Sequence, residues 1–226
     1  MSWSEWAPGR AVEPSIYAAD FARLGEQVSA LLQAGARVFH VDVGDGHFIP
    51  PVTFGPVVIQ AIAPLVHEAG GVLDCHLMVD NPASQIPELA AAGADSVTFH
   101  VEVVEAPDEV VALARGLGLG VGVALNPGTP VELAAGAAAG ADLVLCMSIV
   151  PGYSGQPFMP EALPRIRRLR SILPPSVRLQ VDGGIGGRTI ADAHEAGASL
   201  LVAGSAVFGA DDPGEAYRAL AAAVGA

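Results

Sequence analysis

The sequence contains no lysine, because all 11 of its basic residues are arginines. A Schiff base with a carbonyl substrate, or with pyridoxal phosphate, needs a lysine amine, so both kinds of catalysis are excluded. Against 24 acidic residues, the arginines leave a formal net charge of -13. Nucleic acids and anionic membranes are bound by clustered basic side chains, so neither is an expected partner. A small anion held by local groups remains compatible with this charge.

Cysteine and long apolar runs are also scarce. The two cysteines, Cys75 and Cys146, lie inside apolar segments and are predicted to be buried, unpaired thiols, as in a reducing compartment. No run reaches the roughly 18 apolar residues of a membrane span. Residues 1–12 lack the apolar core of a secretory signal. We therefore expect a soluble, cytoplasmic protein.

Short strand-like runs alternate with longer helical patterns along the whole chain. This alternation is typical of repeated βα units around a parallel sheet. It predicts an α/β fold, a single (β/α)8 TIM barrel over residues 1–226 with residues 1–12 as an N-terminal extension; an open, doubly wound sheet is the structural alternative. The expected strands are 13–18, 38–43, 73–79, 96–102, 120–126, 143–149, 178–182 and 200–207.

The tripeptide Ala-Gly-Ala occurs four times, each time between a helical pattern and the next expected strand. A glycine at the end of a helix commonly adopts the left-handed conformation that other residues avoid. The repeats therefore predict helix ends at Gly35, Gly93, Gly140 and Gly197.

Polar side chains alternate with apolar ones in three of the expected strands. In the second strand His40 and Asp42 share one face, in the third His76 shares a face with Asp74 and Met78, and in the seventh Asp182 follows Gln180 on the same face. Barrel enzymes carry their catalytic groups at the C-terminal ends of the strands. Two imidazoles and two carboxylates are thus predicted to converge inside the barrel.

Two carboxylates buried together are costly unless a positive charge compensates, and no lysine is present to do so. One divalent metal ion would provide that charge. Two histidines and two aspartates suit Zn, Fe, Mn or Co, and the ligand types do not choose among them.

Glycine-rich segments follow the sixth, seventh and eighth strands. They are Pro151-Gly152-Tyr153-Ser154-Gly155-Gln156, Asp182-Gly183-Gly184 and Ala203-Gly204-Ser205. Barrels often bind phosphate through backbone N-H groups of these last loops and the N-terminus of a short helix. The three segments together predict a phosphate site.

These motifs resemble those of the ribulose-phosphate 3-epimerase family over residues 14–213. The similar segments are Pro14-Ser15-Ile16 with Ala19-Asp20-Phe21, His40-Val41-Asp42 with Asp45-Gly46-His47-Phe48, Asp74-Cys75-His76-Leu77-Met78-Val79, Met147-Ser148 with Pro151-Gly152, Val181-Asp182-Gly183-Gly184 and Ala203-Gly204-Ser205-Ala206.

The resemblance implies a role for individual residues. It makes His40, Asp42, His76 and Asp182 the ligands of one divalent ion, and Asp42 and Asp182 also the catalytic acid and base. It implies that the phosphate is held by Gly155, Gly183, Gly184, Gly204 and Ser205, and that the rest of the substrate site includes Ser15, Tyr17, Gly44, Met78, Met147, Gly152 and Ser154. His47 and His100 match no ligand position and are interpreted as structural or exposed.

The function that the resemblance implies is 3-epimerisation of a ketose phosphate, such as the interconversion of D-ribulose 5-phosphate and D-xylulose 5-phosphate. One aspartate would remove the C3 proton and the other would protonate the opposite face of a 2,3-enediolate. The partner is a small sugar phosphate, and the chain is expected to form a homo-oligomer. The alternatives are a barrel that binds sugar phosphate without catalysis and, less favoured, a lyase or another isomerase on this scaffold.

The sequence departs from the family pattern at four positions. Tyr17 replaces a smaller aliphatic residue, Gly44 replaces a methionine, Ser154 replaces a glycine of the phosphate loop, and Val150 also differs. Loss of the methionine would open space, and the Tyr17 hydroxyl would meet an additional substrate hydroxyl. These changes favour a six- or seven-carbon ketulose phosphate over the pentulose.

Overall fold

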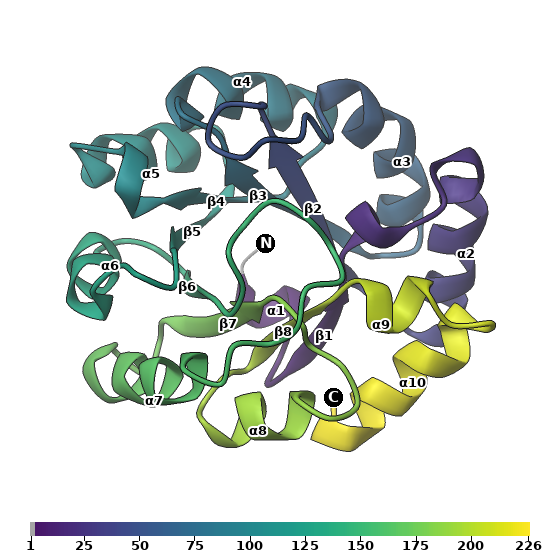
Figure 1. The fold of residues 1–226 in the computed structure, drawn as a ribbon. Coiled ribbons are helices and arrows are strands. Elements are labelled where there is room, and N and C mark those ends of the chain that lie inside the picture. Colours follow the sequence, from purple (N-terminus) through teal and green to yellow (C-terminus); the bar gives the residue numbers. More distant parts are fainter. Residues whose placement is uncertain (1–2) are drawn as a thin grey trace.

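A computed structural model describes residues 3–226, and its centre is a ring of eight parallel strands (Figure 1). Neighbouring strands pair in the order β1-β8-β7-β6-β5-β4-β3-β2, and a parallel bridge between Ser15 and His40 joins the two ends. The barrel prediction is therefore confirmed, and the open-sheet alternative is wrong. The strands are β1 (Ala11–Pro14), β2 (Val38–Gly44), β3 (Val72–Met78), β4 (Ser96–His100), β5 (Gly120–Leu125), β6 (Leu143–Met147), β7 (Arg178–Asp182) and β8 (Leu200–Ala203).

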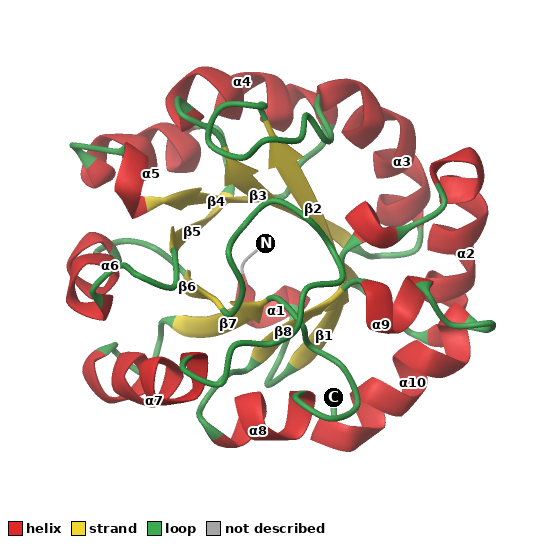
Figure 2. Cartoon of the chain, viewed as in Figure 1, coloured by secondary structure: helices red, strands yellow, loops and turns green. Residues whose placement is uncertain are grey.

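Helices surround this ring (Figure 2). They are α2 (Leu24–Ala34), α3 (Pro56–Glu68), α4 (Pro82–Ala92), α5 (Pro107–Gly116), α6 (Val131–Ala137), α7 (Ala162–Ile172), α8 (Ile190–Glu195), α9 (Ser205–Phe208) and α10 (Pro213–Val224), with single 3-10 turns η1 (Ile16–Ala18), η2 (Phe21–Arg23) and η3 (Val101–Val103). Within residues 3–226 no helix combines the length and the apolar character needed to cross a membrane.

The glycines of the four Ala-Gly-Ala repeats all have positive φ, between 77° at Gly140 and 120° at Gly197. Gly35 and Gly93 each cap the helix before them in the left-handed conformation. These two ends confirm the prediction, because a side chain would strain the backbone there. Helices α6 and α8 end earlier, at Ala137 and Glu195, and Gly140 and Gly197 lie in the turns that follow them.

Several strands are shorter than expected at their C-terminal ends. The chain leaves β1 after Pro14 to form η1, leaves β4 after His100 to form η3, and leaves β8 after Ala203 to form α9. The local β-propensity continues past these points, but short helical turns there redirect the chain over the mouth of the barrel. At the other end β1 begins at Ala11, so residues 11 and 12 belong to the barrel and not to an extension.

The residues before β1 pack against the N-terminal end of the barrel. Helix α1 (Trp3–Trp6) is seen within the ring of strands in Figure 1, and Trp3 is only 2% exposed. The Trp3 indole donates a hydrogen bond to the Ser96 hydroxyl at 3.2 Å. The part of the expected extension that begins at Trp3 therefore closes one end of the barrel. Met1 and Ser2 lie outside the described residues.

Alternation along the strands divides the core into two parts. Phe39, Val41 and Val43 of β2 belong to the large apolar cluster between strands and helices, whereas Val38 belongs to a separate cluster that includes Trp3, Leu145 and Met147. The two cysteines are buried and unpaired, as predicted. The polar alternate positions of β2, β3 and β7 consequently face into the barrel.

Candidate active site

A cavity of about 670 Å³ opens at the C-terminal ends of the strands. It is the end at which the predicted catalytic residues lie. Of the predicted site residues, the cavity is lined by Ser15, Tyr17, Asp42, Met78, Met147, Gly152, Ser154, Gly155, Asp182, Gly183, Gly184, Gly204 and Ser205. His40 and His76 lie beneath its floor and are fully buried.

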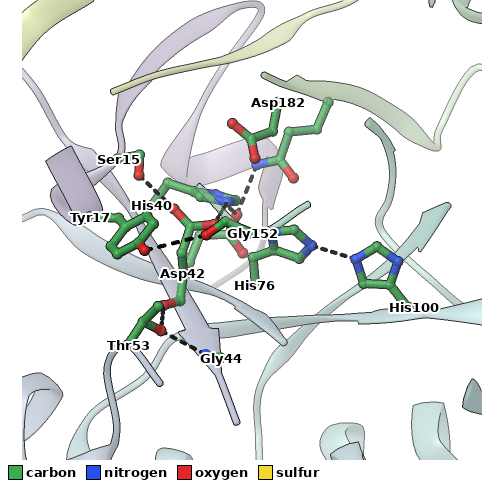
Figure 3. Close-up of polar contacts among 12 residues, drawn as sticks. Ser15, Tyr17, His40, Asp42, Gly44, Thr53, His76, His100, Gly152 and Asp182 are labelled. Carbon is green, nitrogen blue, oxygen red and sulfur yellow. Dashed lines mark hydrogen bonds and ion pairs between the residues drawn. The ribbon is translucent and has the colours of Figure 1, made fainter. Parts of the chain in front are cut away.

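The four predicted ligands are close enough to share one ion. One donor atom each from His40, Asp42, His76 and Asp182 can be chosen so that all lie within 4.8 Å of one another. Asp42 Oδ1 lies 3.5 Å from His40 Nε2 and 3.2 Å from His76 Nδ1 (Figure 3). The Ser15 hydroxyl donates to the other oxygen, Asp42 Oδ2, at 2.6 Å. Asp42 is thus fixed on both oxygens.

The two aspartates differ in their electrostatic surroundings. Burial favours the neutral acid at Asp42, but the positive charge of His40 outweighs it and holds the pKa of Asp42 well below its usual range. Burial, reinforced by the negative charge of Asp42, raises the pKa of Asp182 to about 7. Without a bound cation, Asp42 is therefore ionised at neutral pH, while Asp182 is partly protonated.

The donor set fits a divalent cation. His40 Nε2 is buried and has no hydrogen-bond partner within residues 3–226, although it points toward the two carboxylates. A buried nitrogen of this kind is costly to leave unpaired. Two imidazole nitrogens and two carboxylate oxygens supply the donors and the negative charge that a divalent ion needs, and they suit Zn, Fe, Mn and Co alike.

A second polar group lies deeper in the barrel, and its full extent was not predicted. The Gln180 amide donates to Glu13 Oε2 and to Asp74 Oδ2, the latter at 2.8 Å, and His40 Nδ1 lies 3.3 Å from the same Asp74 oxygen. Burial and the charge of Asp74 raise the pKa of Glu13 to about 8, so Glu13 is mostly neutral. Asp74 therefore accepts the Nδ1 proton of His40 and directs Nε2 toward the cavity.

His100, which the sequence analysis interpreted as structural or exposed, lies in the interior of the barrel. It is buried, and its Nε2 lies 2.8 Å from Nε2 of His76 (Figure 3). Its position on β4, on the same face as Ser96 and Thr98, was a signal for an inward orientation that could have been used. Burial lowers the pKa of His100 to about 4, so the ring is neutral at pH 7. His47 is exposed, in line with the prediction for that residue.

Glycines permit the loops after β6 and β7 to approach each other. Gly183 and Gly184 have φ values of 119° and 63°. A Cβ on Gly184 would lie 2.3 Å from the backbone nitrogen of Phe158, and one on Gly183 would lie 2.5 Å from Ile149. No other residue fits there, so the two loops form one continuous wall of the cavity.

The expectation that Gly44 opens space for a longer substrate is wrong. A Cβ on Gly44 would lie 2.6 Å from Cδ1 of Ile49 and 3.0 Å from the carbonyl oxygen of Pro51, so the space is already filled. Gly44 does not line the cavity. The Tyr17 hydroxyl lies 3.3 Å from the Gly152 carbonyl oxygen and donates to it, which makes it less available to a substrate hydroxyl.

Arg188 is a lining residue that the sequence analysis did not consider. Among the described residues it is the one arginine, lysine or histidine on the wall of the cavity, where it follows Gly186 and Gly187. The phosphate prediction concerned backbone groups only. The positive side chain of Arg188 beside these backbone groups attracts an anionic substrate locally. The net negative charge of the whole protein acts in the opposite direction.

The sequence is similar to known proteins over most of its length. A sequence model described as the ribulose-phosphate 3 epimerase family matches residues 11–208. The ribulose-phosphate 3-epimerase of Mycobacterium tuberculosis (strain ATCC 25618 / H37Rv) is 42% identical over 221 residues, which cover 96% of this chain and 94% of that protein. The cytoplasmic isoform of ribulose-phosphate 3-epimerase from Oryza sativa subsp. japonica is 43% identical over 213 residues, 92% of each chain.

Solved structures with a similar fold are more distant in sequence. A crystal structure of KGPDC from Streptococcus mutans has a TM-score of 0.74 at 13% identity, covering 96% of this chain and 97% of that one. 3-Hexulose-6-phosphate synthase from Salmonella typhimurium has a TM-score of 0.72 at 19% identity, covering 95% and 98%. These two support the barrel fold alone. The family match over most of the sequence, with relatives at 42% identity, decides the assignment, and the chain belongs to the ribulose-phosphate 3-epimerase family.

Proposed function

We propose that this protein is an isomerase that interconverts D-ribulose 5-phosphate and D-xylulose 5-phosphate by epimerisation at C3. The observation that carries the proposal is the pair Asp42 and Asp182, two carboxylates that line one cavity and lie within reach of one common ion. Membership of the family and the matching names of relatives at 42% identity support it.

The reaction needs a proton to be removed beside a ketone and another to be delivered to the opposite face of the same carbon. One aspartate, ionised, takes the C3 proton, and the other, protonated, delivers its own proton to the opposite face; the roles reverse in the other direction. A single base that returned the same proton would regenerate the starting configuration. Asp42 and Asp182 come from β2 and β7 and line the same cavity, so both carboxylates can reach a substrate bound there.

A divalent ion bound by His40, Asp42, His76 and Asp182 would supply Lewis-acid stabilisation of the negative charge that develops on the substrate oxygens. The chain's own contribution is to hold these groups. The Ser15 hydroxyl holds Asp42 by its Oδ2 atom, and Asp74 holds the ring of His40. Met78 and Met147 line the cavity and exclude water from the reacting carbon.

The phosphate end of the substrate is proposed to lie against the loops after β6, β7 and β8. The backbone N-H groups of Gly155, Gly183, Gly184, Gly204 and Ser205 are the proposed donors. The Ser154 hydroxyl lies beside this group of donors: its oxygen is 3.5 Å from the position that a Cβ on Gly204 would occupy. Ser154 can therefore donate where the family has a glycine.

The pentulose is preferred in this proposal over six- and seven-carbon ketulose phosphates, because Ile49 fills the space beside Gly44. The test is to follow each substrate by NMR in D2O with the metal-loaded protein. Conversion of ribulose 5-phosphate to xylulose 5-phosphate, with deuterium at C3 of the product, is expected, with a kcat/KM that exceeds those of hexulose and heptulose phosphates. Binding without C3 exchange would identify a non-catalytic barrel instead.

Two further properties are part of the proposal. A cytoplasmic location is supported by the unpaired cysteines and by the rice relative, which is named as a cytoplasmic isoform. Assembly into a homo-oligomer stays a prediction, which the mass of the protein in solution would test.

A further inference from the structure

A chain of hydrogen bonds runs from the candidate metal site to the loop between β5 and α6. His76 Nε2 lies 2.8 Å from His100 Nε2, and His100 Nδ1 lies 3.1 Å from Glu102 Oε2. The other oxygen, Glu102 Oε1, accepts from the backbone N-H of Asn126 at 2.7 Å and from the Thr129 hydroxyl. Both imidazoles are fully buried, while the Glu102 side chain is 22% exposed.

The direction of each hydrogen bond in this chain follows from its two ends. Glu102 is surrounded by donors and has its pKa lowered to about 2, so it is an ionised acceptor. His100 Nδ1 must therefore carry a proton. The inner end of the chain fixes the other bond, because Nδ1 of His76 is the nitrogen that faces Asp42 and the metal site, and an imidazole nitrogen binds a metal only when it carries no proton. The proton of His76 is therefore on Nε2, which donates to Nε2 of His100.

We propose that Glu102 and His100 are positioning residues that fix the tautomer of His76, so that its Nδ1 faces the metal site with a free lone pair. The proposal rests on the metal site of the proposed function. Nδ1 is the atom that lies 3.2 Å from Asp42 Oδ1. With no proton between them, these two atoms repel each other unless a cation lies nearby. The site would thus bind a divalent ion without first displacing a proton from His76.

The first test measures the tautomers directly in the metal-free wild-type protein. Two-bond 15N-1H couplings of histidine rings distinguish the forms. We expect the proton of His76 on Nε2 and that of His100 on Nδ1. A proton on Nδ1 of His76 would overturn the proposal, and this measurement requires neither activity nor a bound metal.

The second test uses Glu102→Gln, which reverses the whole chain. The fixed N-H of Asn126 requires the glutamine oxygen to stay where Oε1 is, so the new NH2 group must face His100 Nδ1. His100 would then carry its proton on Nε2 and donate to His76, whose own proton would move to Nδ1. We expect Zn²⁺ affinity, measured by competition with a chelator, to fall about 10- to 100-fold.

Two controls separate this effect from simpler ones. Glu105→Gln removes the same charge from an exposed position three residues away and should leave Zn²⁺ affinity unchanged. Thr129→Val weakens the loop contact but keeps the Glu102 carboxylate and the Asn126 donor, so the tautomers should also stay unchanged. If Glu102→Gln binds Zn²⁺ as tightly as Glu105→Gln, the proposal fails.

The two proposals can fail separately. If the wild-type protein has the expected tautomers and Zn²⁺ response but does not epimerise ribulose 5-phosphate, the proposed function fails and the positioning role stands. If it epimerises the substrate while Glu102→Gln retains wild-type Zn²⁺ affinity, only the positioning role fails.

Discussion

The packing around Gly44 leads to a quantitative prediction for Gly44→Ala. The new Cβ would lie 2.6 Å from Cδ1 and 3.0 Å from Cγ1 of Ile49, and 3.0 Å from the backbone oxygen of Pro51. Ile49 is only 1% exposed, so it has little room to move. The φ angle of Gly44 lies outside the left-handed region, so crowding and not backbone strain is the cause of any destabilisation.

Two opposing terms set the magnitude. Overpacking of a filled core typically costs about 1 to 3 kcal/mol. Replacing glycine by alanine also restricts the unfolded chain, which stabilises the folded state by about 0.4 to 1 kcal/mol. We therefore expect Gly44→Ala to lower the free energy of unfolding by about 1 to 2 kcal/mol. The Gly44 N-H donates to the Thr53 hydroxyl, which in turn donates to the Asp42 carbonyl, so a shift of Gly44 should also lower kcat.

A double-mutant cycle with Ile49→Val tests whether crowding against Ile49 is the source of the destabilisation in Gly44→Ala. Valine lacks Cδ1, the atom of the shortest contact, and by itself the substitution should cost about 0.5 to 1.5 kcal/mol. In urea unfolding monitored by circular dichroism, the loss of stability in the double variant should be about 1 kcal/mol smaller than the sum of the losses in the two single variants. The relief is partial, because the contacts with Cγ1 of Ile49 and with the Pro51 oxygen remain. Additive effects, or a Gly44→Ala variant as stable as wild type, would show that the space beside Gly44 is free.

The remaining predictions concern the catalytic pair, the phosphate end and the closed end of the barrel. Asp42→Asn and Asp182→Asn should each abolish epimerisation while the surviving carboxylate still exchanges C3 hydrogen with D2O; near wild-type turnover in either variant would exclude the two-base scheme. Arg188→Gln should raise KM for ribulose 5-phosphate about tenfold with little change in kcat, as expected for a lost charged hydrogen bond; Arg167→Gln, which does not line the cavity, is its matched control, and equal KM values in the two variants would contradict the role. Trp3→Ala should destabilise the protein by about 3 to 5 kcal/mol in urea unfolding, and a loss below about 1 kcal/mol would mean that the N-terminal segment does not close the barrel.

The sequence was sufficient for those features that depend on local periodicity. Because side chains alternate along a strand, the order of residues in β2, β3 and β7 already placed His40, Asp42, His76 and Asp182 on the inner face. Their positions near the ends of parallel strands brought them to one end of the barrel. The positive φ of the four glycines in Ala-Gly-Ala was likewise predictable, since the conformation of a glycine after a helix is a local matter.

Only the tertiary structure decided which side chains share space. Ile49 reaches back from the loop after β2 to fill the volume beside Gly44, and Tyr17 donates to Gly152 more than a hundred residues away. Gln180 meets Glu13 because β7 and β1 both face the barrel axis, and His100 meets His76 because β3 and β4 are neighbours. Periodicity specifies the face on which a residue lies. It does not specify what fills the space opposite that face, because that depends on loop paths and on the packing of strands that are distant in sequence.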